Sequence, residues 1–208
     1  HRYTTKQTNS MIITTASMKG GVGKSTTAIH LAAYLNAHKP ALLVDGDRNR
    51  SCLEWAKAEK LPFRVVDERG SAKHIRNYEH IVIDTQAGTT GADLKELAEG
   101  CDLLVIPTTP DFLSLKALIL TLEELQPIGA ESFKVLLTII PPAPSRTGDE
   151  ARESLRDAKL PLFKGGIRRF VAFQKAALEG VTVDQARDER AAEAWADYAA
   201  IGKELLKK

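Results

Sequence analysis

Residues 18–26 of the chain, Met-Lys-Gly-Gly-Val-Gly-Lys-Ser-Thr, contain the residue types from which proteins build phosphate-binding loops. The glycines can adopt backbone angles that bring successive N–H groups close to phosphate oxygens, and the start of a helix adds partial positive charge. Lys24 would supply a cation, and the Ser25 hydroxyl would bind a magnesium ion that bridges the terminal phosphates. The pattern therefore predicts a site for magnesium and a nucleoside triphosphate such as ATP. The predicted nucleotide contacts are Lys19, Gly20, Gly21, Val22, Gly23, Lys24, Ser25 and Thr26.

The loop has one unusual position. The general pattern G-x-x-x-x-G-K-[ST] has glycine where this chain has Met18, and the variant with a lysine at the next position, Lys19, belongs to a narrower set of ATPases. A tight glycine turn that only caps a helix is the alternative interpretation. The flanking residues favour the phosphate loop, because an apolar, strand-like stretch at 11–17 precedes it and a helix-like stretch at 24–37 follows it.

Short apolar runs alternate with helix-like segments along much of the chain. Because the runs are continuously apolar, they predict parallel strands that are covered by helices on both faces. Ligands of such sheets bind at the carboxyl ends of the strands, where the glycine-rich loop also lies. The last third of the chain is expected to be mostly helical. Further strands are predicted at 41–45, 63–67, 80–84, 102–107 and 133–139, and further helices at 50–59, 92–99 and 113–125.

Size and composition predict one cytosolic domain. The chain has 208 residues, of which 43% are hydrophobic and 27% charged, so it can bury one substantial core. We expect a single domain at 11–208, preceded by a polar tail or expression remnant at 1–10. Two cysteines, Cys52 and Cys101, show neither metal-ligand spacing nor a disulfide framework and are interpreted as buried or half-buried thiols. No apolar run approaches about 18 residues, and no secretory signal is visible.

Aspartates end two of the predicted strands on the side of the glycine-rich loop. Asp45 and Asp47 follow the run 42–44, and Asp84 follows 80–83. Since hydrated magnesium prefers oxygen ligands, Asp84 is expected to hold a metal-bound water, and Asp45 could support the same shell. Asp47 is better placed to orient the attacking water. The alternative is that these aspartates only mark strand ends. The predicted metal residues are thus Ser25, Asp45 and Asp84, and Lys24 and Asp47 are predicted to be catalytic.

Three segments together resemble the motifs of one known family. Residues 19–26, followed by 44–47 and then 83–84, are similar to the motifs of the ParA/MinD group of deviant Walker A ATPases. Almost the whole chain can be aligned with that pattern. The sequences of residues 105–110 and 176–206 are more similar to those of ParA-type partition ATPases than to those of MinD.

The resemblance implies an α/β fold of the P-loop NTPase type, with a mostly parallel sheet of seven or eight strands and helices on both faces. It also implies a homodimer with ATP between the two subunits. The lysine matching Lys19 reaches the partner's nucleotide in that dimer, so Lys19 would couple ATP binding to dimer formation and stabilise charge during hydrolysis. Lys19 is therefore added to the predicted catalytic residues.

Two segments differ from the residues that members of the family usually have at these positions. Relatives commonly continue the second motif as Asp-Pro-Gln, whereas this chain has Asp47-Arg48-Asn49. They often have prolines after the third motif, whereas residues 85–88 are Thr-Gln-Ala-Gly. We therefore expect ATP hydrolysis to ADP and phosphate that is slow and stimulated by a partner.

Basic residues gather between 158 and 178, a stretch without acidic residues, whereas 179–197 is rich in acids. Non-specific DNA binding needs only several cations that displace counterions, and the net charge of +2 requires them to form a local patch. Arg169 corresponds best to a basic position that contributes to DNA binding in ParA-type relatives. A solvated basic face without a ligand is the alternative. The predicted DNA-binding residues are Lys164, Arg168, Arg169 and Lys175.

The resemblance implies an ATP-driven positioning system in the cytoplasm. An ATP dimer would bind the nucleoid, and a ParB-like or other cargo adaptor would stimulate hydrolysis and release it locally. The cargo could be a plasmid, a chromosome origin or a protein assembly such as a carboxysome. Membrane targeting is disfavoured, because the apolar positions of the last predicted helix fit core packing. These positions are Ala194, Trp195, Tyr198, Ile201 and Leu205.

Two other functions remain open. One is a nucleotide switch that binds a protein partner without DNA. The other is a metal-cluster carrier similar to the nitrogenase iron protein, for which Cys52 and Cys101 are the only possible cysteine ligands. Neither cysteine lies just after Asp84, where that resemblance would require one.

Overall fold

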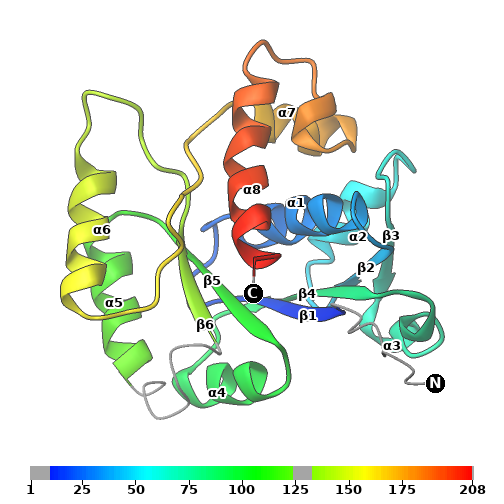
Figure 1. Cartoon of the computed structure of the whole chain (residues 1–208), viewed down its shortest axis with the longest axis horizontal. Helices are drawn as coiled ribbons and strands as arrows, with labels where there is room; N and C mark the ends of the chain where they lie inside the picture. Colours follow the sequence, from blue (N-terminus) through cyan, green and yellow to red (C-terminus); the bar gives the residue numbers. More distant parts are fainter. Residues whose placement is uncertain (1–9, 124–132, 208) are drawn as a thin grey trace, which may run out of the picture.

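A six-stranded parallel sheet forms the centre of the computed structural model, which describes residues 10–123 and 133–207 (Figure 1). The strand order is β3-β2-β4-β1-β5-β6, so the first strand lies in the interior of the sheet, between β4 and β5. Every residue of β2 and β5 is buried, as expected for strands covered on both faces. The strands are β1 (Met11–Ser17), β2 (Ala41–Asp45), β3 (Arg64–Asp67), β4 (His80–Ala87), β5 (Leu103–Thr108) and β6 (Phe133–Leu137).

Helices cover both faces of this sheet (Figure 1). Helices α1, α2, α7 and α8 share one apolar core with alternate residues of the strands, whereas α4, α5 and α6 share a second core on the opposite face. Two one-turn 3₁₀ helices lie at Ile75–Asn77 and Val183–Gln185. The helices are α1 (Lys24–Asn36), α2 (Ser51–Ala56), α3 (Glu68–Ser71), α4 (Gly91–Glu99), α5 (Phe112–Glu123), α6 (Thr147–Asp157), α7 (Ala172–Glu179) and α8 (Ala191–Leu205).

The predicted number of seven or eight strands is wrong for the described residues, which form six. Residues 161–169 run along β6 and exchange backbone hydrogen bonds with it, for example from Phe163 N–H to Val135 O at 3.0 Å. Only isolated bridges form there. Pro161 has no N–H to donate, and Arg152 donates to the carbonyls of Phe163 and Gly165. These interruptions prevent a continuous ladder, so a covering segment replaces an additional strand.

Most other predicted elements are confirmed, with small shifts of their ends. The strand predicted at 80–84 extends to Ala87, and the helix predicted at 50–59 is limited to Ser51–Ala56. The predicted tail at 1–10 lies almost wholly outside the described residues, as do the last two residues of the helix predicted at 113–125. None of the helices in the described segments combines the length and apolar character needed to cross a bilayer.

Helix α8 packs against α1 and contributes to the core, as its apolar spacing predicted. Ala194, Tyr198, Ile201 and Leu205 are buried, and Trp195 is partly buried against the same cluster. The Tyr198 hydroxyl also lies 3.0 Å from the Thr27 hydroxyl, within hydrogen-bonding distance of the first turn of α1. The C-terminal helix therefore supports the helix that follows the glycine-rich loop.

Candidate nucleotide site

The glycine-rich loop joins the end of β1 to the start of α1. Gly21 and Gly23 have φ values of 79° and 82°, a left-handed conformation in which glycine carries no Cβ penalty. The Thr138 hydroxyl donates to Val22 O at 2.7 Å and lies 3.1 Å from Thr108 O, which fixes the loop to the ends of β5 and β6. Contacts within the chain thus hold the curved shape of the loop.

Lys24 lies below this loop and is almost completely buried, with 6% of its surface exposed. Its Nζ donates to Asp84 Oδ1 at 2.8 Å and to Asp47 Oδ2 at 3.1 Å. Burial favours a low pKa for Lys24, but the charge of Asp84 and the hydrogen bonds to both carboxylates outweigh it and raise the pKa above its ordinary value. The fold therefore brings together three residues that the sequence predicted for one site.

The parallel register of the strands explains why these residues lie close together. Asp84 on β4 is paired with Asp45 on β2 and with Thr15 on β1, so all three lie at the carboxyl ends of adjacent strands. Asp84 is fully buried, and its Oδ1 accepts a hydrogen bond from the Thr15 hydroxyl at 3.0 Å. Its other oxygen, Oδ2, lies 3.3 Å from the Cys52 sulfur. Thr15 and Cys52 were not among the predicted site residues.

Asp45 makes structural contacts with the segment that follows it. Its Oδ1 accepts the Asp47 N–H at 3.1 Å and its Oδ2 accepts the Leu53 N–H at 2.9 Å. Burial raises the pKa of Asp45, although these backbone hydrogen bonds oppose the rise. The carboxylate thereby closes the turn that carries Asp47 and the start of α2. Its predicted support of the metal shell stays a prediction.

We expect Asp45→Ala to destabilise the protein by about 1–3 kcal/mol, because the buried N–H of Asp47 and the partly buried N–H of Leu53 lose their acceptor. ATP binding should weaken as well, since Asp47 and Cys52 depend on this turn for their positions. Urea unfolding and titration with a fluorescent ATP analogue measure the two effects. Asp67→Ala is a comparison at the end of the adjacent strand, where the carboxylate caps α3 and lies 3.6 Å from Arg50 Nη1. Unchanged stability of the Asp45 variant would contradict the structural role.

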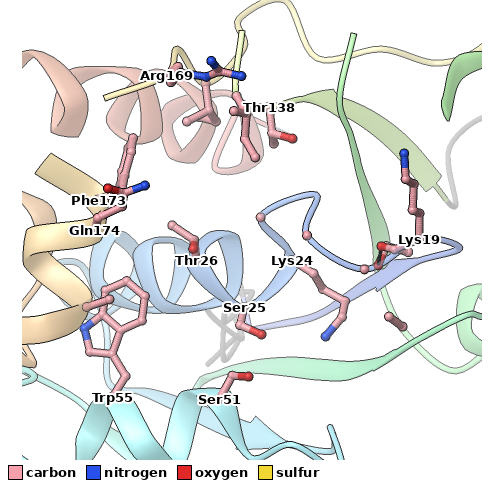
Figure 2. A pocket seen from close by; sticks show the side chains of 18 of the residues that line it. Lys19, Lys24, Ser25, Thr26, Ser51, Trp55, Thr138, Arg169, Phe173 and Gln174 are labelled. Carbon is pink, nitrogen blue, oxygen red and sulfur yellow. Dashed lines mark hydrogen bonds between the residues drawn. The ribbon is translucent and has the colours of Figure 1, made fainter. Parts of the chain in front are cut away.

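Lys19 lies on the same loop but makes different contacts. Its side chain is 61% exposed, its Nζ donates to Ser114 Oγ at 3.1 Å, and Asp111 Oδ1 is 3.9 Å away. Figure 2 shows the Lys19 and Lys24 side chains pointing in different directions. Hydrogen bonds from Ser114 and Thr109 hold the pKa of Asp111 well below its usual value. Lys19 is thus held by a surface contact outside the buried group around Lys24.

A cavity of about 760 Å³ opens over the loop, a size typical of small-molecule sites. Figure 2 shows Trp55, Phe173 and Gln174 on one side of it and the two loop lysines on the other. All the predicted nucleotide contacts line the cavity except Val22, which is buried beneath the loop. The sequence did not predict the residues that form the remaining walls of the cavity. Aromatic and apolar residues occur in cores as well as in cavities, so their presence in the sequence does not distinguish the two. These missed residues include Trp55, Thr138, Ile139, Phe170, Phe173 and Gln174.

The predicted DNA-binding residues do not form one free basic patch. Arg168 Nη2 donates to Asp197 Oδ1 at 2.8 Å, and Lys175 Nζ lies 2.9 Å from Asp188 Oδ2. In the described part of the chain, the Arg169 guanidinium and the Lys164 ammonium have no hydrogen bond or ion pair. Arg169 lines the nucleotide cavity. Two of the four cations are therefore neutralised locally.

The two cysteines are far apart in the fold. Cys52 is buried at the carboxyl ends of the strands, next to Asp84, whereas Cys101 is half-buried and precedes β5, at the amino ends. Residues 10–123 and 133–207 contain no cluster of three or more His, Cys, Asp or Glu side chains suited to a metal ion. The predicted burial of both thiols is confirmed, and one subunit does not bring them to a shared cluster.

A parallel sheet with a glycine-rich loop between its central strand and α1, and with aspartates at neighbouring strand ends, defines a P-loop nucleotide-binding protein. The model of the CobQ/CobB/MinD/ParA nucleotide-binding domain matches residues 13–183, and the chain belongs to this family. The protein is thus a ParA/MinD-type ATPase, as the motifs predicted.

Individual relatives agree with this assignment. The chain is 36% identical over 201 residues to the maintenance of carboxysome distribution protein A of Gloeobacter kilaueensis, a match that covers 93% of each chain. Its fold is similar to that of the MinD cell division protein of Aquifex aeolicus, with a TM-score of 0.72, 17% identity and coverage of 95% of this chain and 97% of that one. A ParA family ATPase of Chlorobium tepidum gives a TM-score of 0.66 at 18% identity, with coverage of 92% and 98%.

Proposed function

We propose that the protein is a dimerising ATPase that binds DNA without sequence preference and positions a protein assembly of the carboxysome type. The position of Lys19 carries this proposal. It is exposed and lies outside the buried group formed by Lys24, Asp47 and Asp84, so it is available to a second subunit. The cargo class is suggested by the carboxysome distribution protein that is similar along almost the whole chain. A ParB-like adaptor and a plasmid are the corresponding partner and cargo in the other branch of the family.

The residues present fit magnesium and ATP. The left-handed glycines turn the loop for phosphate contacts, and the Ser25 hydroxyl and the Asp84 carboxylate are oxygen ligands of the type that magnesium prefers. The lack of a protein-only metal cluster in the described residues agrees with a metal held mainly by phosphates and water. When bound, magnesium supplies charge neutralisation at the phosphates.

The ion pairs of Lys24 suggest how ATP binding prepares the site. Lys24 neutralises Asp84 and Asp47 in the structure. Phosphate oxygens compete for the same ammonium, so Lys24 would turn toward them and release both carboxylates. Asp84 would then hold a metal-bound water and Asp47 would orient the attacking water. Lys19 would stabilise charge in the partner's site during hydrolysis.

The test is binding to duplex DNA of arbitrary sequence at fixed salt, with ATP, with ADP and without nucleotide. We expect ATP alone to promote binding. Lys19→Ala should abolish this effect because dimers no longer form, and Arg169→Ala should weaken binding on the order of tenfold because a phosphate-binding cation is lost. Arg168→Ala is the control, since its charge is already paired with Asp197 and should change binding much less.

The outcome also separates this function from its main alternative. A nucleotide switch that binds a protein partner without DNA is favoured by the neutralised charges of Arg168 and Lys175. If the protein binds ATP but ignores DNA in every nucleotide state, this switch becomes the better account. Steady-state ATPase assays with and without an adaptor then measure its turnover.

A further inference from the structure

We infer that Cys52 is a positioning residue that fixes the rotation of the Asp84 carboxylate for magnesium binding. The inference rests on the proposed role of Asp84 as the holder of a metal-bound water. The Cys52 sulfur lies 3.3 Å from Asp84 Oδ2 and 3.9 Å from Ser25 O, so the thiol sits between the two proposed metal residues. Both Cys52 and Asp84 are fully buried.

The two oxygens of Asp84 have different partners. Oδ1 accepts hydrogen bonds from the Lys24 ammonium at 2.8 Å and from the Thr15 hydroxyl at 3.0 Å, whereas Oδ2 faces the Cys52 thiol. If Lys24 turns toward phosphates, only the neutral donors of Thr15 and Cys52 continue to hold the carboxylate. One donor on each oxygen fixes the plane of the carboxylate, which leaves the position vacated by Lys24 open on Oδ1.

The thiol is suited to this role because an S–H group is a weak hydrogen-bond donor. A weak S–H donor orients Oδ2 and withdraws little charge from the carboxylate.

Cys52 also connects Asp84 to the segment that carries Asp47. It is the second residue of α2, and the next residue, Leu53, donates its N–H to Asp45. Asp45 in turn accepts the Asp47 N–H. A movement of this turn would therefore change the thiol contact, which couples the residue proposed to orient water to the residue proposed to hold the metal.

The test measures the magnesium dependence of binding to a fluorescent ATP analogue, in wild type, Cys52→Ala and Cys52→Ser. We expect Cys52→Ala to raise the half-saturating magnesium concentration about fivefold, as expected for the loss of one buried hydrogen bond behind a metal residue. Binding of the analogue in EDTA should stay unchanged, because the phosphate loop is intact. Cys52→Ser, which keeps a donor, should restore the magnesium dependence to within about twofold of wild type.

Three further variants make the result unambiguous. Cys52→Val removes the donor without leaving a cavity and should match the alanine variant, so it serves if alanine disturbs folding. Cys101→Ala changes a thiol at the opposite end of the sheet and should have no effect. Asp84→Asn should shift the magnesium dependence more than any Cys52 variant. A shift in Asp84→Asn but in neither Cys52→Ala nor Cys52→Val would overturn the positioning role. No shift in Asp84→Asn would overturn the proposed function of Asp84 itself.

Discussion

Lys24→Ala is expected to weaken ATP binding by at least about 100-fold, because it removes a buried cation of the loop that we propose to turn toward the phosphates. The same change should destabilise the nucleotide-free protein by about 3–5 kcal/mol. In the variant, Asp84 and Asp47 would stay buried at the strand ends but would lose the ammonium that neutralises them. Titration with a fluorescent ATP analogue and urea unfolding measure the two losses.

A control on the same loop separates local chemistry from general damage. Lys19→Ala removes an exposed lysine, so stability should stay within about 0.5 kcal/mol of wild type and the monomer should bind ATP normally. If Lys24→Ala is too unstable to titrate, Lys24→Gln keeps a donor without the charge and should show the same loss of affinity. Normal ATP binding by either Lys24 variant would contradict the assignment of the loop.

His30 should make the protein less stable as the pH falls. It is fully buried in α1, and its Nε2 accepts the Val183 N–H at 3.0 Å, so the hydrogen is on Nδ1 and is donated to Thr26 O at 2.7 Å. The ring stacks on Tyr198 with 4.8 Å between the centroids. Burial lowers the pKa of His30 to about 4, although the Thr26 carbonyl and Asp184 oppose this shift.

The direction of the effect follows from proton binding in the two states. The unfolded chain binds the proton near pH 6.5 and the folded protein only near pH 4, so stability is intact above pH 6.5 and is lost between these values. The loss at pH 4 should be about 3 kcal/mol. Urea unfolding between pH 4 and 8 measures it, and His30→Gln, which keeps a donor and an acceptor, should flatten the profile by that amount.

The second buried histidine requires its own control. Burial and then the charge of Lys39 also lower the pKa of His80, so His80→Gln should remove a separate part of the pH dependence. Subtracting the pH profile of each variant's unfolding free energy from that of wild type gives the contribution of the substituted histidine. The carboxylates that titrate in the same range cancel in this difference. A His30 variant with the full wild-type pH profile would contradict a buried neutral ring.

The phosphate loop and the strand-end aspartates could be predicted because each depends on local order in the sequence. Glycine spacing encodes the left-handed turns, and an aspartate directly after an apolar run must lie at a strand end. The contacts among them could not be predicted. The Cys52 contact with Asp84 spans 32 residues, and the contact of Thr138 with Val22 spans 116, so only the folded packing reveals either.

The local charge balance could not be predicted either, because Asp197, 29 positions after Arg168, neutralises that arginine, while DNA binding itself stays a prediction. The strand number was taken from a resemblance, whereas Pro161 and the contacts of Arg152 limit the last segment to isolated bridges. The local sequence therefore predicted the chemical groups of the site better than it predicted the side chains around them.

The central position of β1 sets the order in which a growing chain can fold. This strand is synthesised before its neighbours β4 and β5, which begin only at residues 80 and 103, and before Tyr198, which contacts Thr27 from 171 positions later in the chain. The apolar surfaces of β1 and α1 therefore stay uncovered until these later segments have been made, a period in which such segments are prone to aggregate or to bind chaperones. The nucleotide loop is thus made before the strands and the helix that complete its surroundings.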